Sequence, residues 1–406
     1  MRLLPLLLLA ACTGPADDPK NDTGEADADT DADTDADTDT DADTDTDTAG
    51  PPPRGIGPGY TGLSRVLLVA GEGPVGNEPS DVLVYDPMED TLTTVEGLSV
   101  SGDAILDCAG DALFVLESRV SSGQNDRIVR IDPATATFTE WDAGSNFQPR
   151  DIAAVDGGYW VANWNRSWIS TFAADGTSGA FVDIAAHADA DNVPEATGVF
   201  TADDVVYVTV LRQTQADGAL NGARLLEIDP ATREVTRTVD LSGAWPSGRM
   251  FVAGDNLQVH HRSTLAADFR LNADGGVETI ALADLASTGF LLDDATLDVR
   301  QTVIGFDVGA HRAWFPWVGA DGAPSLGGVS LLGGAFVARW PITSQVVGLG
   351  AFEGTLWTGQ NPFTVEDDGA IVGRSMTDGS ESHRVDLTGR VRSLTVCVPE
   401  QAHGAE

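Results

Sequence analysis

Four arginines stand at matching places in the sequence, and their side chains are the best candidates for binding a ligand. Basic residues are scarce, because the 406-residue chain has 23 Lys and Arg against 63 Asp and Glu. Arg150, Arg249, Arg300 and Arg390 each lie near the start of a short apolar run. Guanidinium groups donate several hydrogen bonds in a fixed plane, so four of them together would suit a carboxylate or an acidic sugar. The alternative is that each pairs with a nearby carboxylate, such as Asp151.

The first of three cysteines stands in a segment that predicts lipid attachment. The stretch MRLLPLLLLAAC has one positive charge, an apolar run too short to span a bilayer and two small residues before Cys12, which is the layout of a secretory signal. LAAC resembles the bacterial lipobox, in which the cysteine thiol receives a diacylglyceryl group and the chain is cut just before it. We therefore expect a signal peptide over residues 1–11 and an acylated Cys12 that carries fatty acids such as palmitate. The alternative is an ordinary signal peptide cut near Ala11.

The residue after this cysteine bears on the destination of the protein. In enterobacterial lipoproteins an aspartate at that place directs retention in the inner membrane, whereas Thr13 stands here. The resemblance therefore favours an outer-membrane lipoprotein of the bacterial cell envelope. The sequence is compatible both with a protein that faces the periplasm and with one that faces the cell surface.

Residues 12–59 are expected to form a disordered acidic tether. The repeat DADTDADTDADTDTDADTDTDT, from Asp27 to Thr48, has Ala as its only apolar residue. Dense like charge with so little apolar surface cannot offset the entropy lost on folding. The stretch AGPPPRGIGPG then stiffens the chain, because proline fixes its φ angle. A calcium site is the alternative, but the repeat lacks the glycine and bidentate glutamate of tight calcium loops.

The charge balance excludes several classes of partner. The formal net charge is −40. A surface this acidic argues against binding nucleic acid and against flat docking on anionic lipid. The N-terminal lipid is therefore the expected contact with the membrane, and residues 401–406 are expected to be a flexible tail.

Residues 60–400 contain a repeated pair of β-hairpins. One hairpin recurs as AILDCAGDALFVLES, DIAAVDGGYWVANW, GVFTADDVVYVTVL, MFVAGDNLQVHHR, VIGFDVGAHRAWFPWV and GLGAFEGTLWTGQ, with its turns 46, 47, 51, 55 and 44 residues apart. Between these hairpins lie strands joined by Asp-Pro or Ala-Asp-Gly turns, such as IVRIDPATATFTEW and LLEIDPATREVTRTV. Four antiparallel strands per repeat predict the blade of an all-β β-propeller.

The two ends of this region predict how the ring closes. The N-terminal side supplies three strands, and the C-terminus ends in the unpaired strand GRVRSLTVCV. If that strand completes the first blade, there are seven four-stranded blades; six or eight are the alternatives. Cys108 and Cys397 would then lie on neighbouring innermost strands, either as a disulfide or as two buried thiols. The starts of the innermost strands, and with them the four arginines, would gather at one mouth of the central channel.

The stretch IVRIDPATATFTEWDAGSNFQPRDIAAVDGGYWVANWNRSWISTFAADGT, residues 128–177, resembles the blades of YVTN and NHL propellers and of streptogramin lyase-like proteins. Those families also run from an Asp-Pro turn through a P-x-x-I-A strand to an aromatic W-V-A-N strand. The resemblance covers residues 225–260 as well. It implies the fold far more than any activity, because propellers serve as binding proteins, lactonases and lyases.

The catalytic residues of such enzymes have no clear equivalents here. Streptogramin lyase-like enzymes use histidine and carboxylate around magnesium, but His260 and His261 are adjacent on a strand and should point to opposite faces. Gluconolactonase-like propellers hold a divalent ion with Glu, Asn and Asp, yet Asn163, Asn165 and Asp203 form no matching set. We therefore assign no catalytic residue and leave the metal ligands open. The tryptophans in NWNRSW and RAWFPWV are expected to pack between blades; a sugar-stacking platform is the alternative.

These observations predict a lipid-anchored cell-envelope β-propeller with a monomeric head. Its predicted function is that of a non-catalytic binding or scaffold module for an envelope protein, a polysaccharide or a small anion. No cofactor is predicted. The alternative is a metal-dependent lactonase or streptogramin lyase-like enzyme that uses a divalent metal in the central channel.

Overall fold

The structure is a computed structural model, and it describes most of the region predicted to be a propeller. The described residues are 66–71, 80–100, 104–118, 125–214, 218–264, 272–297, 305–307, 312–318, 324–331, 335–363 and 368–397. The predicted signal peptide, tether and tail lie outside them, and so do Cys12 and Arg300. None of the described helices is long and apolar enough to span a bilayer.

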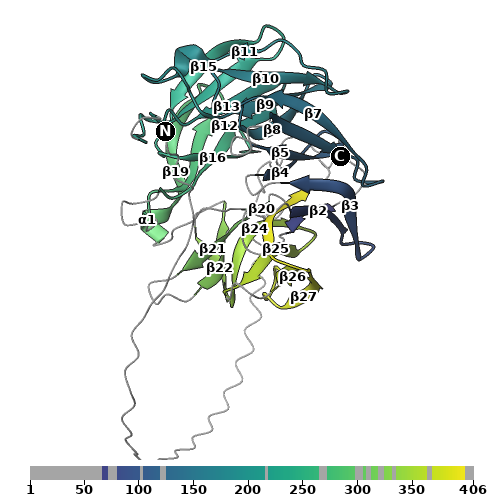
Figure 1. The fold of residues 1–406 in the computed structure, drawn as a ribbon. Coiled ribbons are helices and arrows are strands. Elements are labelled where there is room, and N and C mark those ends of the chain that lie inside the picture. The colour runs from purple at the N-terminus through teal and green to yellow at the C-terminus, as the bar shows by residue number, and fades with distance from the viewer. Residues whose placement is uncertain are drawn as a thin grey trace, which may run out of the picture. The chain divides into compact units, whose positions relative to one another are not determined.

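The described strands form an all-β β-propeller, as predicted (Figure 1). Hydrogen bonds join them into seven four-stranded antiparallel sheets, of which six contain four consecutive strands and one combines both ends of the chain. Sheet 1 contains β28 (Val391–Cys397), β1 (Val66–Gly71), β2 (Ser80–Asp86) and β3 (Thr91–Val100). Sheet 2 contains β4 (Ala104–Ala109), β5 (Ala112–Glu117), β6 (Asp126–Ile131) and β7 (Phe138–Gly144).

The remaining sheets follow in chain order. Sheet 3 contains β8 (Pro149–Val155), β9 (Gly158–Asn163), β10 (Trp168–Ala173) and β11 (Val182–Asp183). Sheet 4 contains β12 (Ala196–Ala202), β13 (Val205–Val210), β14 (Arg224–Asp229) and β15 (Glu234–Asp240). Sheet 5 contains β16 (Pro246–Ala253), β17 (Asn256–His261), β18 (Gly276–Ala281) and β19 (Ala286–Asp293). Sheet 6 contains β20 (Gly305–Asp307), β21 (Arg312–Val318), β22 (Pro324–Ser330) and β23 (Phe336–Pro341). Sheet 7 contains β24 (Ser344–Phe352), β25 (Thr355–Pro362), β26 (Ala370–Ser375) and β27 (Glu381–Asp386). The helical elements described are single turns, η2 (Ala185–His187) and α1 (Asp294–Leu297).

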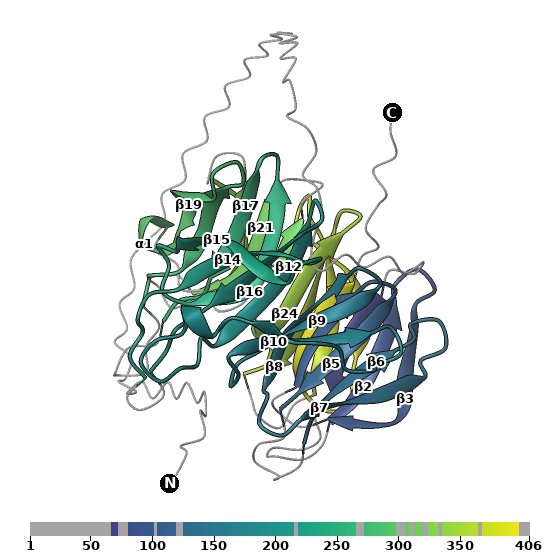
Figure 2. The same ribbon diagram turned by 90° about the horizontal axis from the view of Figure 1, so that it is seen from above.

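The two ends of the propeller meet in sheet 1, where β28 pairs with β1 along its whole length. Figure 2 shows the strands of the N-terminal part next to the yellow strands of the C-terminal part. A disulfide adds a covalent link at this place, with 2.06 Å between the sulfurs of Cys108 and Cys397 and 5.9 Å between their Cα atoms. The sequence left open whether these cysteines form a disulfide or stay as two buried thiols, and the structure contains the disulfide.

One strand of each sheet lies innermost, next to the central channel. These innermost strands are β28, β4, β8, β12, β16, β20 and β24. Neighbouring innermost strands pack side by side in the order β28, β4, β8, β12 and β16, and again from β20 through β24 to β28 (Figure 1). Sheets 5 and 6 meet through a buried apolar cluster in which Phe251 and Val277 lie with Phe315 and Val329. The sheets therefore form a closed ring, and β16 lies across it from β28 and β4.

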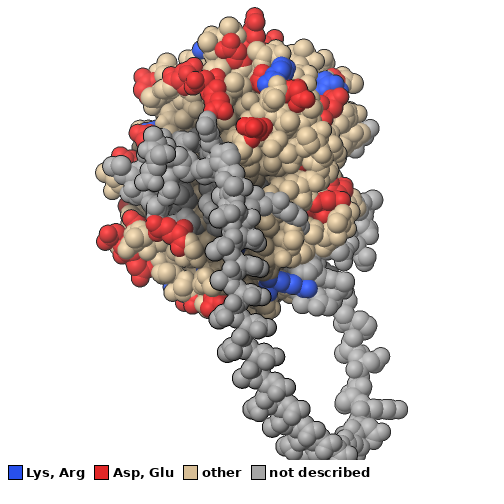
Figure 3. Space-filling view, turned by 180° about the vertical axis from the view of Figure 1, so that it is seen from behind, with Lys and Arg blue, Asp and Glu red and all other residues tan. Residues whose placement is uncertain are grey.

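The inner and outer strands differ in burial in the way the sequence pattern indicates. All six residues of β5 are buried, whereas β27 is almost entirely exposed. The innermost strands also come very close together, since a Cβ atom on Gly198 of β12 would lie 2.4 Å from the Cα atom of Gly248 on β16. Acidic side chains form several separate patches on the side shown in Figure 3, with few Lys or Arg among them.

The predicted turns have the conformations that their residues favour. The β8–β9 and β24–β25 turns have two residues with positive φ, Asp156 and Gly157 in one and Glu353 and Gly354 in the other. Such two-residue turns match the twist of a hairpin. In the Asp-Pro turns, the side chain of Asp229 accepts hydrogen bonds from backbone N–H groups one and two residues beyond the proline.

Candidate functional site

Two of the predicted arginines lie in one basic region of the channel mouth. Arg150 is the second residue of β8, and its guanidinium lies over the ring of Trp164 at 5.1 Å. Arg249 lies on β16. Arg390 lies just before β28 and donates a hydrogen bond to the carbonyl oxygen of Pro362, 3.2 Å away.

A further arginine, Arg262, joins this region and was missed in the sequence. It follows β17, and its guanidinium stacks on the ring of Trp245 at 4.1 Å. Within the described part of the chain, this guanidinium makes no side-chain hydrogen bond or ion pair. Burial, followed by the positive charge of Arg150, lowers the pKa of Arg262 to about 10. The charge of Arg262 is therefore held in place without a compensating carboxylate among the described residues.

His260 is the fourth member of the region. Its side chain is buried with 1% exposure, and its Nδ1 atom lies 2.6 Å from the hydroxyl of Ser247. That hydroxyl accepts a hydrogen bond from the backbone N–H of Arg249. Burial lowers the pKa of His260 well below its usual range, and the charges of His261, Arg262 and Arg249 lower it further. The ring is therefore neutral near pH 7.

The other ring nitrogen of this histidine can still form a hydrogen bond. Nε2 of His260 has no hydrogen-bond partner among the described residues, although it is buried. A buried polar atom without a partner is costly and uncommon in proteins. We call Arg150, Arg249, His260 and Arg262 the basic cluster.

Two aspartates from neighbouring innermost strands form a second group in the channel. Asp107 lies on β4 and accepts a hydrogen bond from the N–H of Cys108 at 2.9 Å, while Asp151 on β8 accepts one from the N–H of Val199 at 2.8 Å. Burial raises the pKa of Asp151 well above its usual range, and the adjacent carboxyl of Asp107 raises it further. A carboxyl that is buried beside a second carboxyl keeps its proton more readily than one in water. We call Asp107 and Asp151 the carboxyl pair.

Arg249 connects the basic cluster to the carboxyl pair. Its Nη1 atom lies 3.7 Å from Oδ1 of Asp107, and its Nη2 atom donates to the hydroxyl of Thr395 at 3.5 Å. Since β16 lies across the ring from β4 and β28, this side chain crosses the channel. Its side chain is 43% exposed. Both contacts are long, so the guanidinium can exchange them for contacts to a ligand at little cost.

The other sequence candidates have separate structural partners. The amide of Asn163 donates to Ser170 and to the carbonyl of Trp168, whereas the amide of Asn165 donates to Asn146. Asp203 lies in the β12–β13 turn. Among the described residues, no group of three or more His, Cys, Asp or Glu is placed to hold a metal ion.

The two adjacent histidines point to different neighbours, as predicted. His260 contacts Ser247, whereas Nε2 of His261 lies 2.9 Å from a carboxylate oxygen of Glu278. Both members of that second pair are completely buried. Hydrogen bonds from His261, Ser287 and the Ser242 backbone lower the pKa of Glu278 to about 2, against the raising effect of its burial.

Two of the tryptophans in the stretches NWNRSW and RAWFPWV, which were expected to pack between blades, pack against other aromatic rings. Trp314 is fully buried and stacks on Trp340, with 4.7 Å between ring centroids. Trp168 packs against Phe181, with 5.0 Å between centroids. At the channel mouth, guanidinium groups lie over one face of Trp164 and of Trp245, so these rings fix arginines rather than stack sugars.

A shallow cleft of about 330 Å³ lies away from this chemistry. It is lined by the β8–β9 turn, by residues of β10 and by the Asp-Pro turn of sheet 4, including Tyr159, Phe172 and Arg233. The β8–β9 turn is at the opposite end of β8 from Arg150. The cleft therefore contains no member of the basic cluster or the carboxyl pair.

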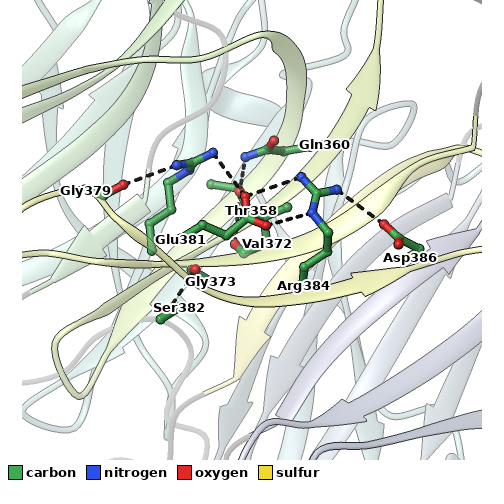
Figure 4. Close-up of polar contacts among 10 residues, drawn as sticks. Thr358, Gln360, Val372, Gly373, Gly379, Glu381, Ser382, Arg384 and Asp386 are labelled. Atoms are coloured by element: carbon green, nitrogen blue, oxygen red, sulfur yellow. Dashed lines mark hydrogen bonds and ion pairs between the residues drawn. The ribbon is translucent and has the colours of Figure 1, made fainter.

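The outermost strand of sheet 7 has an arginine that serves as a comparison for those of the basic cluster. Arg384 on β27 donates to Glu381 at 2.7 Å and to Asp386 at 3.3 Å (Figure 4). Its side chain is 45% exposed. Its charge is thus compensated by two carboxylates, in contrast to that of Arg262.

Comparison with solved structures supports the propeller fold. Apo AztD from Citrobacter koseri is 12% identical and aligns over 83% of this chain and 99% of its own, with a TM-score of 0.51. A 6-phosphogluconolactonase-like protein from Bacteroides uniformis is 10% identical over 82% of this chain and 99% of its own, with a TM-score of 0.52. The β-propeller domain of the trilobed protease from Pyrococcus furiosus is 8% identical over 84% of this chain and 99% of its own, with a TM-score of 0.50. No family model and no curated protein matches the chain, and at these identities the likeness extends to the fold alone.

Proposed function

We propose that this protein is a non-catalytic binding protein whose basic cluster takes up a small carboxylate-bearing anion at the mouth of the propeller channel. The observation that carries this proposal is the guanidinium of Arg262, which is partly buried near Arg150 and has no carboxylate partner among the described residues. A second supporting observation is the unpartnered Nε2 atom of His260. A carboxylate at this place would compensate the arginine charges and give the imidazole a hydrogen-bond partner.

The surrounding structure prepares these groups for binding. Trp164 and Trp245 hold two guanidinium groups by stacking, so little side-chain freedom is lost when the anion binds. The carboxylate can belong to a free small molecule or to a larger envelope partner, a protein or a polysaccharide, that presents an acidic group.

A citrate titration of the full chain tests this proposal. Trp164 and Trp245 lie directly beneath guanidinium groups, so tryptophan fluorescence should change as citrate binds. Arg262→Gln should weaken citrate binding at least tenfold, because a hydrogen bond to a charged group contributes about 1.5–3 kcal/mol. Arg384→Gln, which removes a compensated surface charge, is the matched control and should leave the affinity unchanged. Equal affinities for the wild type and Arg262→Gln would exclude the basic cluster as the site.

We further propose that a lipid on Cys12 anchors the protein in the outer membrane and that the acidic segment over residues 12–59 is a tether. The lipobox-like LAAC stretch and the polyanionic repeat support this part of the proposal. Radioactive palmitate fed to the producing bacterium should label the wild type and should not label Cys12→Ser. Release of the wild type in an unlabelled, soluble form would contradict the anchor.

The alternative function, a metal-dependent lactonase or streptogramin lyase-like enzyme, makes a different prediction. Such an enzyme would retain about one equivalent of a divalent ion after exchange into metal-free buffer. Elemental analysis of the purified chain separates the two functions, because the binding protein proposed here needs no metal.

A further inference from the structure

We propose that the cleft between sheets 3 and 4 is a second binding site, and that it takes a small zwitterion with an apolar body, such as an apolar amino acid. The cleft has a volume of about 330 Å³ and lies at the opposite end of β8 from Arg150. Sites for small molecules usually enclose about 300–1,000 Å³, so a ligand of this class fits. The inference does not depend on the proposed function, because the cleft and the basic cluster share no residue.

Two opposite charges line the cleft from different sheets. Asp156 lies in the β8–β9 turn of sheet 3, and Arg233 lies in the turn between β14 and β15 of sheet 4. Both residues are exposed, and within the described part of the chain neither side chain makes a hydrogen bond or an ion pair. A ligand that carries both a carboxylate and an ammonium group can meet both charges. A simple anion or a simple cation would meet one of them and be repelled by the other.

The floor of the cleft adds an apolar surface and a hydrogen-bond donor. Val155, Trp160 and Phe172 line it, and Val155 and Trp160 belong to the buried apolar cluster between sheets 3 and 4. Trp160 is only 5% exposed, yet its indole N–H makes no hydrogen bond to any described residue. Polar groups on residues this enclosed normally have a partner. The N–H is therefore a second, independent sign that an acceptor such as a carboxylate oxygen binds in the cleft.

The backbone at the two charged residues allows clean substitutions. Asp156 has a φ angle of 48° and Arg233 has one of 62°, so both lie in the left-handed region. Asparagine adopts this region more readily than most residues do. Asp156→Asn and Arg233→Asn should therefore remove one charge each and keep the turns. Asp204, with a φ angle of 61°, lies in the β12–β13 turn and does not line the cleft, so Asp204→Asn is the matched control.

The experiment compares four six-carbon ligands by titration calorimetry of the full chain. Norleucine carries its two charges on one carbon and 6-aminohexanoate carries them at opposite ends, whereas hexanoate and hexylamine carry one charge each. At least one zwitterion should bind about tenfold more tightly than both singly charged ligands, as expected for one more hydrogen bond to a charged group. Each titration is repeated with Arg262→Gln, because carboxylates are also expected to bind at the basic cluster.

The variants assign this preference to the cleft. Asp156→Asn and Arg233→Asn should each weaken zwitterion binding about tenfold, because each removes one charged hydrogen-bond partner. Asp204→Asn and Arg262→Gln should bind the zwitterion as the wild type does. If one of the asparagine variants does not fold, the preference of the wild type among the four ligands still tests the inference.

Three results would overturn the inference. The first is that neither zwitterion binds more tightly than hexanoate and hexylamine. The second is a preference that persists unchanged in both Asp156→Asn and Arg233→Asn, and the third is zwitterion binding that is lost in Arg262→Gln. Failure of the proposed function is seen separately, because it concerns citrate at the basic cluster and leaves the cleft unaffected.

Discussion

At the scale of single residues, the structure separates arginines with compensated charge from one without. Arg384 has two carboxylate partners, whereas Arg262 stacks on Trp245 beside another arginine. The sequence identified Arg150 and Arg249 because they precede or begin apolar runs. Arg262 follows the two histidines of QVHHR, and no sequence pattern shows that its guanidinium packs on Trp245 near Arg150.

Arg262→Gln should make the ligand-free protein more stable. A pKa lowered to about 10 means that the folded state disfavours the charge by roughly 3 kcal/mol, and the lost stacking on Trp245 offsets about 1 kcal/mol of that. We therefore expect the free energy of unfolding in urea to rise by about 1–2 kcal/mol. A structural role for this arginine would instead make the variant less stable than the wild type, so a loss of stability contradicts the account.

The raised pKa of Asp151 predicts a pH-dependent effect of Asp151→Asn. Because the folded-state pKa lies above the unfolded value, the carboxyl contributes its full stability below about pH 4 and loses it as pH rises through the folded-state pKa. The groups that face it are Asp107 and Arg249. The variant should thus gain stability relative to the wild type between pH 4 and pH 8 in urea unfolding. A difference that is constant over this range would contradict the raised pKa of Asp151.

At the scale of elements, short sequence motifs determine the turns. Asp-Pro at 132–133 and at 229–230 was expected to start tight turns, and in both the aspartate side chain accepts backbone hydrogen bonds. These bonds are local, so a sequence is enough to predict them. The stretch that forms sheet 6 is rich in glycine and has few apolar alternations, so its sequence gives only a weak strand signal.

Asp229→Ala should destabilise the β14–β15 turn. The substitution removes an acceptor for the N–H groups of Ala231 and Thr232, at 2.8 and 3.3 Å, and should lower the free energy of unfolding by about 1 kcal/mol. Asp229→Asn retains the accepting oxygen and is the matched control. If the alanine and asparagine variants unfold at the same urea concentration, the side-chain bonds contribute nothing to the turn.

At the scale of the whole molecule, closure of the ring brings distant residues together. The sequence predicted that the C-terminal strand completes the first sheet and left the cysteines as a disulfide or as free thiols. The basic cluster and the carboxyl pair could not be predicted, because Asp107, Arg249 and Thr395 meet only across the channel of the closed ring. Such contacts depend on the register and tilt of strands that are far apart in the chain.

The disulfide should stabilise the closed ring substantially. It links residues 289 positions apart, and in the chain-entropy model a loop of this size contributes roughly 5–6 kcal/mol. Reduction with dithiothreitol should therefore shift the urea midpoint of the wild type to that of Cys108→Ser/Cys397→Ser, which itself should not respond to the reductant. A wild-type midpoint unaffected by complete reduction would show that β28 closes the ring without covalent help.

The central claim is that the basic cluster is an anion site, and an anomalous scattering experiment with selenate tests it most directly. Selenate is an oxyanion that guanidinium groups bind as they bind carboxylates, and selenium marks its position. The account predicts an anomalous peak within hydrogen-bonding distance of the guanidinium of Arg262 in crystals of the wild type, and no peak there in Arg262→Gln. Selenate bound elsewhere on a well-ordered protein, with none at Arg262, would contradict the claim.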